Sequence, residues 1–343
     1  MKKQALYFTA PYQVDIREEP LLEPAPGQIL VRTLVSAVSA GTELLIYRGQ
    51  APLGMTADDT ISSLTGTIGF PMRYGYAAVG EVVEAGLEVK GDWEGRRVFA
   101  FHPHESLFLA EPGGVHLLPP EMAPEEAVFF PNVETALTLV ADGSPAIGEQ
   151  VAVFGQGIVG LLVTSLLARL PLSSLVTLDA YPLRRITSLT VGAHVSLDPA
   201  VPGVIEEAIS LLQGPRVYRG ADLAYEVSGN PDALDQAIGV TGYNGRVVIG
   251  SWYGEKRASI QLGGSFHRSR IRLISSQVSS IEPRLRGRWS KERLQKLAWH
   301  MVEELKPSRF VTHRFPLSEA AEAYRSLDRN AGEALQVVLT YPG

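Results

Sequence analysis

The chain contains no cysteine, and this absence excludes several kinds of chemistry. None of its 343 residues is a cysteine, so disulfides, thiol nucleophiles and cysteine-bound zinc are all excluded. It also lacks the run of about 18 apolar residues that a membrane-spanning helix needs. The first residues include two lysines but no apolar stretch of a signal peptide. We therefore expect a cytoplasmic protein with no membrane partner.

The composition is that of an ordinary folded enzyme with a small acidic excess. Hydrophobic residues make up 45% of the chain and charged residues 20%, and the net charge is -6, which argues against nucleic-acid binding. The local exception is a basic cluster of His267, Arg268, Arg270, Arg272, Arg284, Arg286 and Arg288. It could clamp a carboxylate or phosphate of a substrate, or form structural ion pairs at a dimer edge or domain junction. No aromatic platform lies among these arginines to stack nucleic-acid bases.

The pattern of apolar residues changes near residue 130. Before it, alternation predicts strands at 28–35, 78–86 and 97–101. After it, helical stretches alternate with short apolar strands at 150–154, 175–178, 223–227, 247–249 and 273–276, which predicts a parallel sheet covered by helices. A helix at 290–305, a strand at 310–315, a helix from 318 and a strand at 334–340 then return to the first domain. We expect an α/β protein whose β-rich domain spans 1–130 and 282–343, with a parallel-sheet domain at 131–281.

A glycine-rich turn follows one of these strands and opens a helix. Residues 155–160 read Gly-Gln-Gly-Ile-Val-Gly. In this G-x-G-x-x-G pattern the first glycine permits a tight turn, the second lets the backbone approach a pyrophosphate, and the third allows close packing of helix on strand. The motif predicts a dinucleotide site built from Gly155, Gln156, Gly157, Ile158, Val159 and Gly160.

Asp179 indicates which dinucleotide binds. It ends the next strand about 20 residues beyond the motif, where an acidic side chain accepts the ribose hydroxyls of NAD and repels the 2′-phosphate of NADP. We therefore expect NAD. Arg184 could accommodate that phosphate or simply lie on a solvated helix face, so NADP stays possible.

Several segments together resemble one enzyme superfamily. They are residues 40–43 (AGTE), 74–82 (YGYAAVGEV), 155–160, 226–230 (EVSGN), 245–248 (GRVV) and 313–317 (HRFPL). The chain resembles the medium-chain dehydrogenase/reductases, which include zinc alcohol dehydrogenases and zinc-free quinone reductases. The resemblance implies a GroES-like catalytic domain, a doubly wound Rossmann domain, an active site in the cleft between them, and a homodimer or homotetramer. Residues 39–43, 103–104, 131–137 and 266–268 are similar to the bacteriochlorophyllide hydroxyethyl dehydrogenase group.

The chain departs from this superfamily at its zinc ligands. Zinc-binding members have cysteine at the position of Ala40, a His-Glu pair at Tyr76 and Ala77, and a further ligand near Pro131. The resemblance therefore implies that the zinc site is lost, and we expect no bound metal. The one local cluster that could chelate a metal is His102, His104 and Glu105, since histidines two apart on an extended segment face the same way.

Without zinc, hydrogen-bond donors must stabilise the developing alkoxide. Thr42 matches the family hydroxyl that relays the alcohol proton. Tyr76 puts a phenol where the metal would lie, either as a donor or general acid or as an aromatic plug in the vacated volume. Glu43 could orient Thr42 or a water, or be a carboxylate paired with an arginine.

Four further residues are candidates for the same site. His102 or His104 could accept the proton, because histidine titrates in the useful pH range, or could face solvent. Thr135 matches a family threonine that contacts the nicotinamide carboxamide. Glu134 beside it faces the same cleft or caps a helix. We also expect Ser228, in the 226–230 segment, to contact the cofactor.

These observations predict a zinc-independent, NAD-preferring oxidoreductase acting on a small secondary alcohol or ketone. One alternative is an NADPH-dependent quinone or enoyl reductase, which also works without zinc. The other is a non-catalytic protein that retains NAD(H) binding.

Overall fold

The computed structural model describes residues 2–212 and 219–342. Contacts between residues divide the chain into two compact units, Met1–Pro131 with Val302–Gly343, and Asn132–Met301. No helix in the described ranges is long and apolar enough to cross a membrane.

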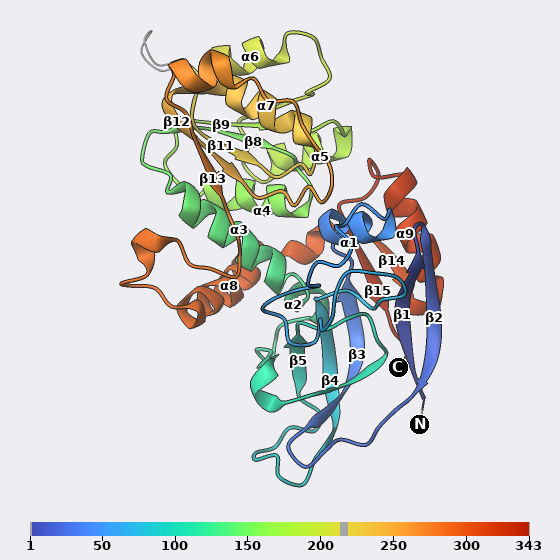
Figure 1. Ribbon diagram of the computed structural model, residues 1–343. Helices are drawn as coiled ribbons and strands as arrows, with labels where there is room; N and C mark the ends of the chain where they lie inside the picture. The colour runs from blue at the N-terminus through green and yellow to red at the C-terminus, as the bar shows by residue number, and fades with distance from the viewer. Residues whose placement is uncertain (1, 213–218, 343) are drawn as a thin grey trace. The chain divides into compact units, whose positions relative to one another are not determined.

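The first unit is rich in strands (Figure 1). Its strands are β1 (Lys2–Ala10), β2 (Gln13–Pro20), β3 (Ile29–Ala37), β4 (Ala78–Ala85), β5 (Arg97–Ala100), β6 (Leu107–Ala110), β7 (Val115–Leu117), β14 (Val311–Pro316) and β15 (Gln336–Thr340). Its α-helices are α1 (Ala40–Tyr47), α2 (Pro124–Ala127) and α9 (Ala320–Arg329), with 3-10 turns at Pro112–Gly114, Pro307–Phe310 and Leu317–Glu319.

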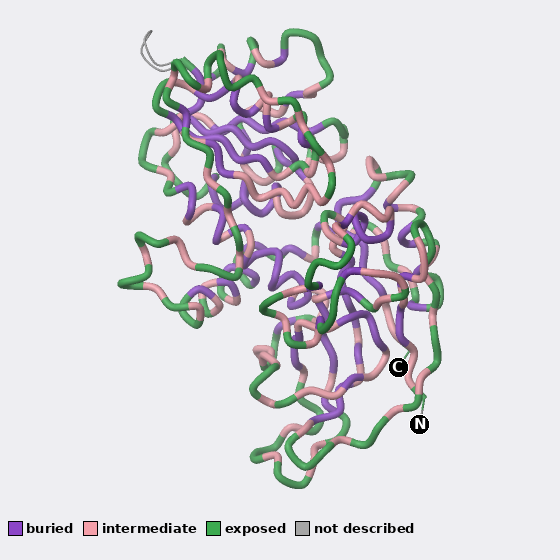
Figure 2. The backbone as a smooth tube through the Cα atoms, in the orientation of Figure 1, coloured by how far each residue is buried: buried purple, intermediate pink, exposed green. Residues whose placement is uncertain are grey.

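The main sheet of this unit combines strands from residues 29–117 with strands from residues 311–340. Its strand order is β14-β15-β3-β4-β5-β7, with β6 also paired to β3, while β1 and β2 form a separate hairpin. Alternate side chains of β3, β4 and β5, including Ile29, Val82 and Val98, form a buried core, which Figure 2 shows as purple strand segments. Because β15 pairs with β3, residues near 340 complete a sheet begun near residue 29.

The second unit alternates strands and helices. Its strands are β8 (Gln150–Phe154), β9 (Ser174–Leu178), β10 (Val195–Leu197), β11 (Ala221–Glu226), β12 (Thr241–Ile249) and β13 (Arg272–Ser275). Its α-helices, in chain order, are α3 (Phe130–Gly143), α4 (Ile158–Leu167), α5 (Pro182–Thr190), α6 (Val204–Leu211), α7 (Pro231–Val240) and α8 (Lys291–Leu305). It also has a π-helical turn at Leu262–Phe266 and a 3-10 turn at Pro283–Leu285.

The second sheet is parallel throughout, in the order β10-β9-β8-β11-β12-β13. Numbered along the unit this is 3-2-1-4-5-6, the doubly wound order. In Figure 1 the helices α6 and α7 lie on one side of the sheet and α4 on the other. The strand order reverses between β8 and β11, and such folds bind ligands at the carboxyl ends of the strands at this point.

The predicted α/β class, with a β-rich unit and a doubly wound parallel sheet, is confirmed. The second unit, however, extends to Met301, whereas the sequence placed the boundary at 281. The difference is α8 and the segment before it. Lys291 at the start of α8 pairs with Glu134 of α3, and Trp289 and Leu294 line a small apolar cavity together with Leu137.

Candidate functional site

The glycine-rich turn links β8 to α4. Gly155 has φ +92°, and a Cβ there would lie 2.5 Å from Cα of Ser228. A Cβ at Gly160 would overlap the carbonyl oxygen of Gly155. A Cβ at Gly157, in contrast, would meet only the Arg184 guanidinium, 3.9 Å away. Packing therefore fixes the outer two glycines, and the space beside the middle one is open.

The start of α4 is suited to bind an anion. Its N-cap is Gly157, and no side chain caps the helix. Ile158 and Val159 are partly exposed in its first turn, whereas the side chain of Gln156 is buried and bonds Thr164. The side chain of Gln156 is therefore not available to a cofactor. A helix N-terminus with free N–H groups is a phosphate site.

Asp179 is fixed beside this turn. Its Oδ2 accepts the backbone N–H of Gln156 at 2.7 Å and its Oδ1 that of Tyr181 at 2.8 Å. Arg184 places Nη1 3.9 Å from Oδ2 of Asp179, and its guanidinium lies 4.8 Å from the centre of the Tyr181 ring. The structure thus brings together the motif, Asp179 and Arg184.

Ser228 lies across the turn from Gly155. Its N–H donates to Oε1 of Glu226 at 2.8 Å, and its hydroxyl donates to the same oxygen. The other carboxylate oxygen accepts the hydroxyl of Tyr253. Glu226 is completely buried, so it orders the loop after β11 against the glycine turn.

Three hydroxyls meet in the first unit at the start of α1. Ser39 and Tyr76 share a hydrogen bond, and Thr42 also bonds the Tyr76 phenol. All three side chains are partly exposed. Burial raises the pKa of Tyr76, against a lowering by these two hydroxyls, so the phenol is neutral at neutral pH. A neutral phenol can donate a hydrogen bond to a substrate oxygen.

Behind these hydroxyls lies a buried pair, Glu43 and His104. Oε2 of Glu43 accepts Nε2 of His104 at 3.1 Å and also the hydroxyl of Tyr324, while Oε1 accepts the backbone N–H of Ser39 at 2.7 Å. Nδ1 of His104 lies 2.7 Å from the hydroxyl of Ser36. Both Glu43 and His104 are fully buried. The alternative of a buried carboxylate therefore holds for Glu43, but its partners are Ser39, His104 and Tyr324 rather than an arginine, and His104 does not face solvent.

The expected orientation of the two histidines is also wrong. His102 stacks on Phe108 with ring centres 4.1 Å apart, whereas His104 lies between Ser36 and Glu43. Burial lowers the pKa of His102 to about 4. Pro103 separates the two residues and the segment forms no regular strand, so two-residue alternation does not hold. Within the described ranges no group of three or more His, Cys, Asp or Glu could hold a metal.

The candidates on α3 have different surroundings. Glu134 is buried and lies 3.0 Å from Nζ of Lys291. Burial raises its pKa, against the lowering by Lys291. Its carboxylate thus faces α8 rather than capping a helix. Thr135 is partly exposed on the same helix.

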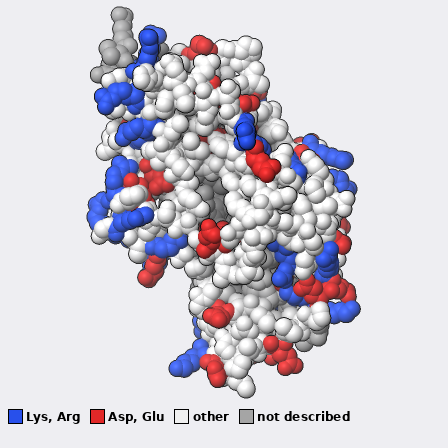
Figure 3. All heavy atoms as spheres, viewed as in Figure 1, with Lys and Arg blue, Asp and Glu red and all other residues white. Residues whose placement is uncertain are grey.

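The residues of the basic cluster are exposed, and few of them form ion pairs. Figure 3 shows Lys and Arg side chains gathered over the segment that precedes α8. Arg284 pairs with Glu282, whereas Arg268, Arg270 and Arg272 form no ion pair within the described part of the chain. Within the described residues the cluster forms no network of ion pairs, and its role as a clamp for a substrate anion or as part of a dimer edge stays a prediction.

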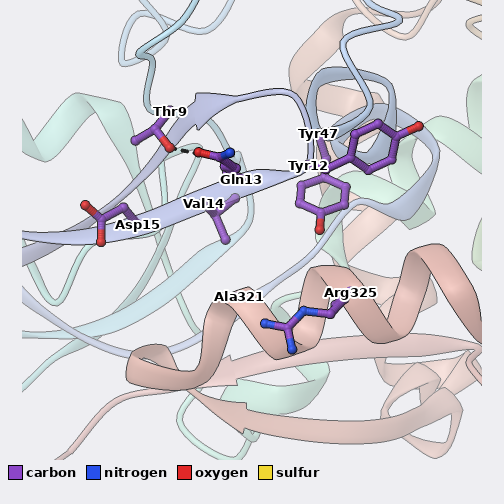
Figure 4. A pocket seen from close by; sticks show the side chains of 8 residues that line it. All are labelled: Thr9, Tyr12, Gln13, Val14, Asp15, Tyr47, Ala321 and Arg325. Atoms are coloured by element: carbon purple, nitrogen blue, oxygen red, sulfur yellow. Dashed lines mark hydrogen bonds between the residues drawn. The ribbon is translucent and has the colours of Figure 1, made fainter.

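A separate cavity of about 350 Å³ lies in the first unit. Figure 4 shows the β1–β2 hairpin on one side of it and α9, carrying Arg325, on the other. Tyr12 and Tyr47 contact each other edge to face at its end, with ring centres 5.6 Å apart. Tyr47 in turn stacks on Tyr324, whose hydroxyl bonds Glu43.

Sequence reasoning missed four residues of the polar cluster. Ser39 was visible in the turn that contains Thr42, and its position before a helix was the available signal. Ser36, Tyr324 and Tyr341 had no local signal, because long stretches of chain separate them from His104 and Glu43. The hydroxyl of Tyr341 lies 2.8 Å from that of Ser36, although 305 positions separate them.

Comparisons with known proteins match this architecture. No family model matches the sequence. (R,R)-butanediol dehydrogenase of Bacillus subtilis is 30% identical over 277 residues, covering 72% of this chain and 77% of that protein. 2-Desacetyl-2-hydroxyethyl bacteriochlorophyllide A dehydrogenase of Cereibacter sphaeroides is 26% identical over 342 residues, covering 94% of each.

Two solved structures share the whole fold. One is a zinc-binding dehydrogenase from Sinorhizobium meliloti bound to NADP, with a TM-score of 0.78, 19% identity and 99% of each chain covered. The other is an E. coli alcohol dehydrogenase complexed with NADH, with a TM-score of 0.78, 17% identity and 99% of each chain covered. Together with the identity to the butanediol enzyme, these findings show that the chain belongs to the medium-chain dehydrogenase/reductase family of oxidoreductases.

Proposed function

We propose that the protein is a zinc-independent, NAD-preferring oxidoreductase that interconverts a secondary alcohol and a ketone. The observation that carries the proposal is the Tyr76 phenol, hydrogen-bonded to Ser39 and Thr42, at a position where zinc-binding relatives have a metal ligand. The names of the relatives, which include butanediol and hydroxyethyl bacteriochlorophyllide dehydrogenases, support an alcohol substrate.

The residues of the second unit fit a nicotinamide dinucleotide. The open space at Gly157 and the uncapped start of α4 suit the pyrophosphate, and Asp179 suits the ribose hydroxyls. When bound, the nicotinamide takes or gives one hydrogen with its electron pair. The similar structures contain NADP in one case and NADH in the other, so they do not favour either dinucleotide.

Asp179 supports the preference for NAD. Two backbone N–H groups hold its two oxygens, so the carboxylate cannot swing away from a 2′-phosphate. Each oxygen still has a lone pair for a ribose hydroxyl. Arg184 offsets part of this charge but at 3.9 Å does not form a close pair with it.

The hydroxyls of the first unit replace the Lewis acid. During ketone reduction Tyr76 donates its proton to the substrate oxygen, and a dinucleotide held at Gly157 and Asp179 would supply the hydrogen and electron pair that the carbonyl carbon needs. In the reverse direction the phenol oxygen takes the alcohol proton back. A donor of this kind contributes about 3 kcal/mol to catalysis when it is preorganised.

The test combines cofactor titration, a substrate panel and metal removal. We expect NADH to bind at least about tenfold more tightly than NADPH, a difference of about 1.4 kcal/mol. We expect turnover of secondary alcohols or ketones that survives chelation, and a loss of about a hundredfold in kcat for Tyr76→Phe. Tighter NADPH binding with reduction of conjugated enones would favour a C=C reductase, and activity lost on chelation and restored by zinc would refute zinc independence.

A further inference from the structure

Ser39 stands at the N-terminus of α1 but does not cap it. Serine is among the preferred N-cap residues, because its oxygen accepts a free N–H of the first turn, worth about 1 kcal/mol. The Ser39 side chain makes no such bond. Its hydroxyl instead bonds the phenol of Tyr76. Helix α1 therefore lacks a stabilising side-chain cap, and the Ser39 hydroxyl is held instead beside the partly exposed Tyr76.

The backbone of Ser39 is fixed by the side chain of Glu43. Oε1 of Glu43 accepts the Ser39 N–H at 2.7 Å, which ties the residue before the helix to its first turn. Oε2 is held by His104 and Tyr324. The carboxylate is fully buried and accepts donors from three separate parts of the chain, so it cannot rotate without breaking buried bonds.

A chain of hydrogen bonds runs from this carboxylate through His104. Nε2 of His104 lies 3.1 Å from Oε2 of Glu43, and Nδ1 lies 2.7 Å from the Ser36 hydroxyl. The Ser36 hydroxyl in turn lies 2.8 Å from that of Tyr341, so the bonds continue without a break from Glu43 to Tyr341. Gly75, at φ +118°, leaves room for the imidazole, because a Cβ there would lie 2.7 Å from it.

The cluster therefore has two layers. Ser39, Thr42 and Tyr76 are partly exposed, whereas Glu43 and His104 are fully buried behind them. The buried layer does not reach solvent, and its bond to the backbone of Ser39 sets where the serine hydroxyl lies. The outer layer can contact a substrate, whereas the buried layer holds the outer hydroxyls in place.

We propose that Ser39 positions the Tyr76 phenol and relays its proton, and that the buried Glu43–His104 pair holds Ser39 for this task. This inference rests on the proposed function. In ketone reduction the phenol proton passes to the substrate oxygen, and the Ser39 hydroxyl proton passes to the phenol oxygen. Ser39 then takes a proton from a water molecule, and the hydroxide that remains leaves to solvent. One proton from water thus reaches the product, and alcohol oxidation runs the same transfers backwards.

The principal test is Ser39→Ala beside Ser39→Thr. Alanine removes the hydroxyl but keeps the N–H bonded to Glu43, so the scaffold remains. We expect kcat to fall about tenfold to a hundredfold with an unchanged Kd for NADH, and the threonine variant to stay within about threefold of the parent. The matched control is Ser106→Ala, whose hydroxyl accepts the N–H of Gln4, and it should leave kcat unchanged. Equal kcat values for the alanine variant and the parent would overturn the inference.

A second readout does not depend on turnover. NMR of ring-labelled tyrosine, with Tyr76→Phe used to assign the signal, reports the hydrogen bonding of the phenol. We expect Ser39→Ala to move the Tyr76 resonance and Ser106→Ala to leave it in place. An unmoved resonance would refute the Ser39 contact even if the parent enzyme has no activity, whereas a moved resonance in an inactive parent would refute the proposed function and keep the contact.

The role of the buried pair is tested by Glu43→Asp. The shorter side chain cannot hold both Ser39 and His104. We expect kcat to fall about tenfold with KM and NADH binding unchanged, and the Tyr76 resonance to move in the same direction as in Ser39→Ala. If Glu43→Asp does not fold, Tyr324→Phe serves instead, because it removes one donor to the same carboxylate and keeps the ring. We expect Tyr324→Phe to shift the Tyr76 resonance by less than Ser39→Ala does. An unmoved Tyr76 resonance in both variants would overturn the role of the pair.

Discussion

The glycine turn of the second unit and the hydroxyl cluster of the first are built by different means. The turn is formed by backbone over a few consecutive residues, and its side-chain partners, Asp179 and Ser228, follow neighbouring strands of one sheet. The hydroxyl cluster is formed by side chains from β3, α1, α9 and two loops. The glycine turn depends on the absence of side chains that would clash with the backbone. The hydroxyl cluster depends on the completeness of a hydrogen-bond network.

The largest effect should come from filling space in the turn. In Gly160→Ala the new Cβ overlaps the rigid backbone oxygen of Gly155, so we expect a loss of about 3 kcal/mol in unfolding free energy and no NADH binding. Denaturant unfolding and fluorescence titration measure both. Gly157→Ala is the control, because φ is −64° there and the space is open. It should keep its stability and lose NADH affinity about tenfold; retained affinity would argue against a cofactor at this backbone.

Acid should weaken the first unit through His102. Its folded pKa of about 4 lies below the ordinary 6.5, because the packed ring disfavours the charged form. The unfolded chain therefore binds the proton first, and stability is lost as the pH falls from about 6.5 to about 4, by about 3 kcal/mol in total. His102→Phe keeps a ring against Phe108 and should show a correspondingly flatter dependence in denaturation from pH 7 to about 4. Parallel pH curves for the two proteins would contradict this account.

Two tyrosines offer a matched comparison of the units. The Tyr324 hydroxyl donates to the buried Glu43, so Tyr324→Phe should destabilise the protein by about 2 kcal/mol. The Tyr225 hydroxyl in the second unit is buried beside Gly143 with no hydrogen-bond partner among the described residues. Tyr225→Phe should therefore stabilise it by about 1 kcal/mol. If the denaturant midpoints of Tyr324→Phe and Tyr225→Phe moved in the same direction, the two hydroxyls would not differ in their effect on stability as expected.

A small effect is expected on the choice of cofactor. Asp179→Asn removes the charge and keeps one acceptor, so the preference for NADH over NADPH should shrink by about tenfold, or about 1.4 kcal/mol. Titration of both cofactors against the parent and the variant measures it. An unchanged ratio would mean that Arg184, not Asp179, governs the choice.

The difference between the local glycine turn and the hydroxyl cluster assembled from remote segments also explains what could be predicted from sequence. The motif at Gly155 and the strand end at Asp179 are local patterns, so sequence alone predicted both elements and the parallel sheet. The partners of Glu43 and His104 come from remote segments, so no periodicity indicated Tyr324 or Ser36. The boundary was placed too early because an ion pair between the buried Glu134 and the partly exposed Lys291 attaches α8 to the second unit. Where a contact depends on distant segments, sequence patterns supply the residues but not their pairing.

The pairing of β15 with β3 has a consequence for synthesis. On the ribosome the parallel-sheet unit is a continuous segment and can fold as soon as it emerges. The first unit must wait for residues 302–341, because β15 extends its sheet and Tyr341 closes the chain of bonds to His104. A nascent chain released before that point would carry a finished dinucleotide turn and an unfinished hydroxyl site. Nucleotide binding should therefore be acquired before catalytic competence as the protein is made.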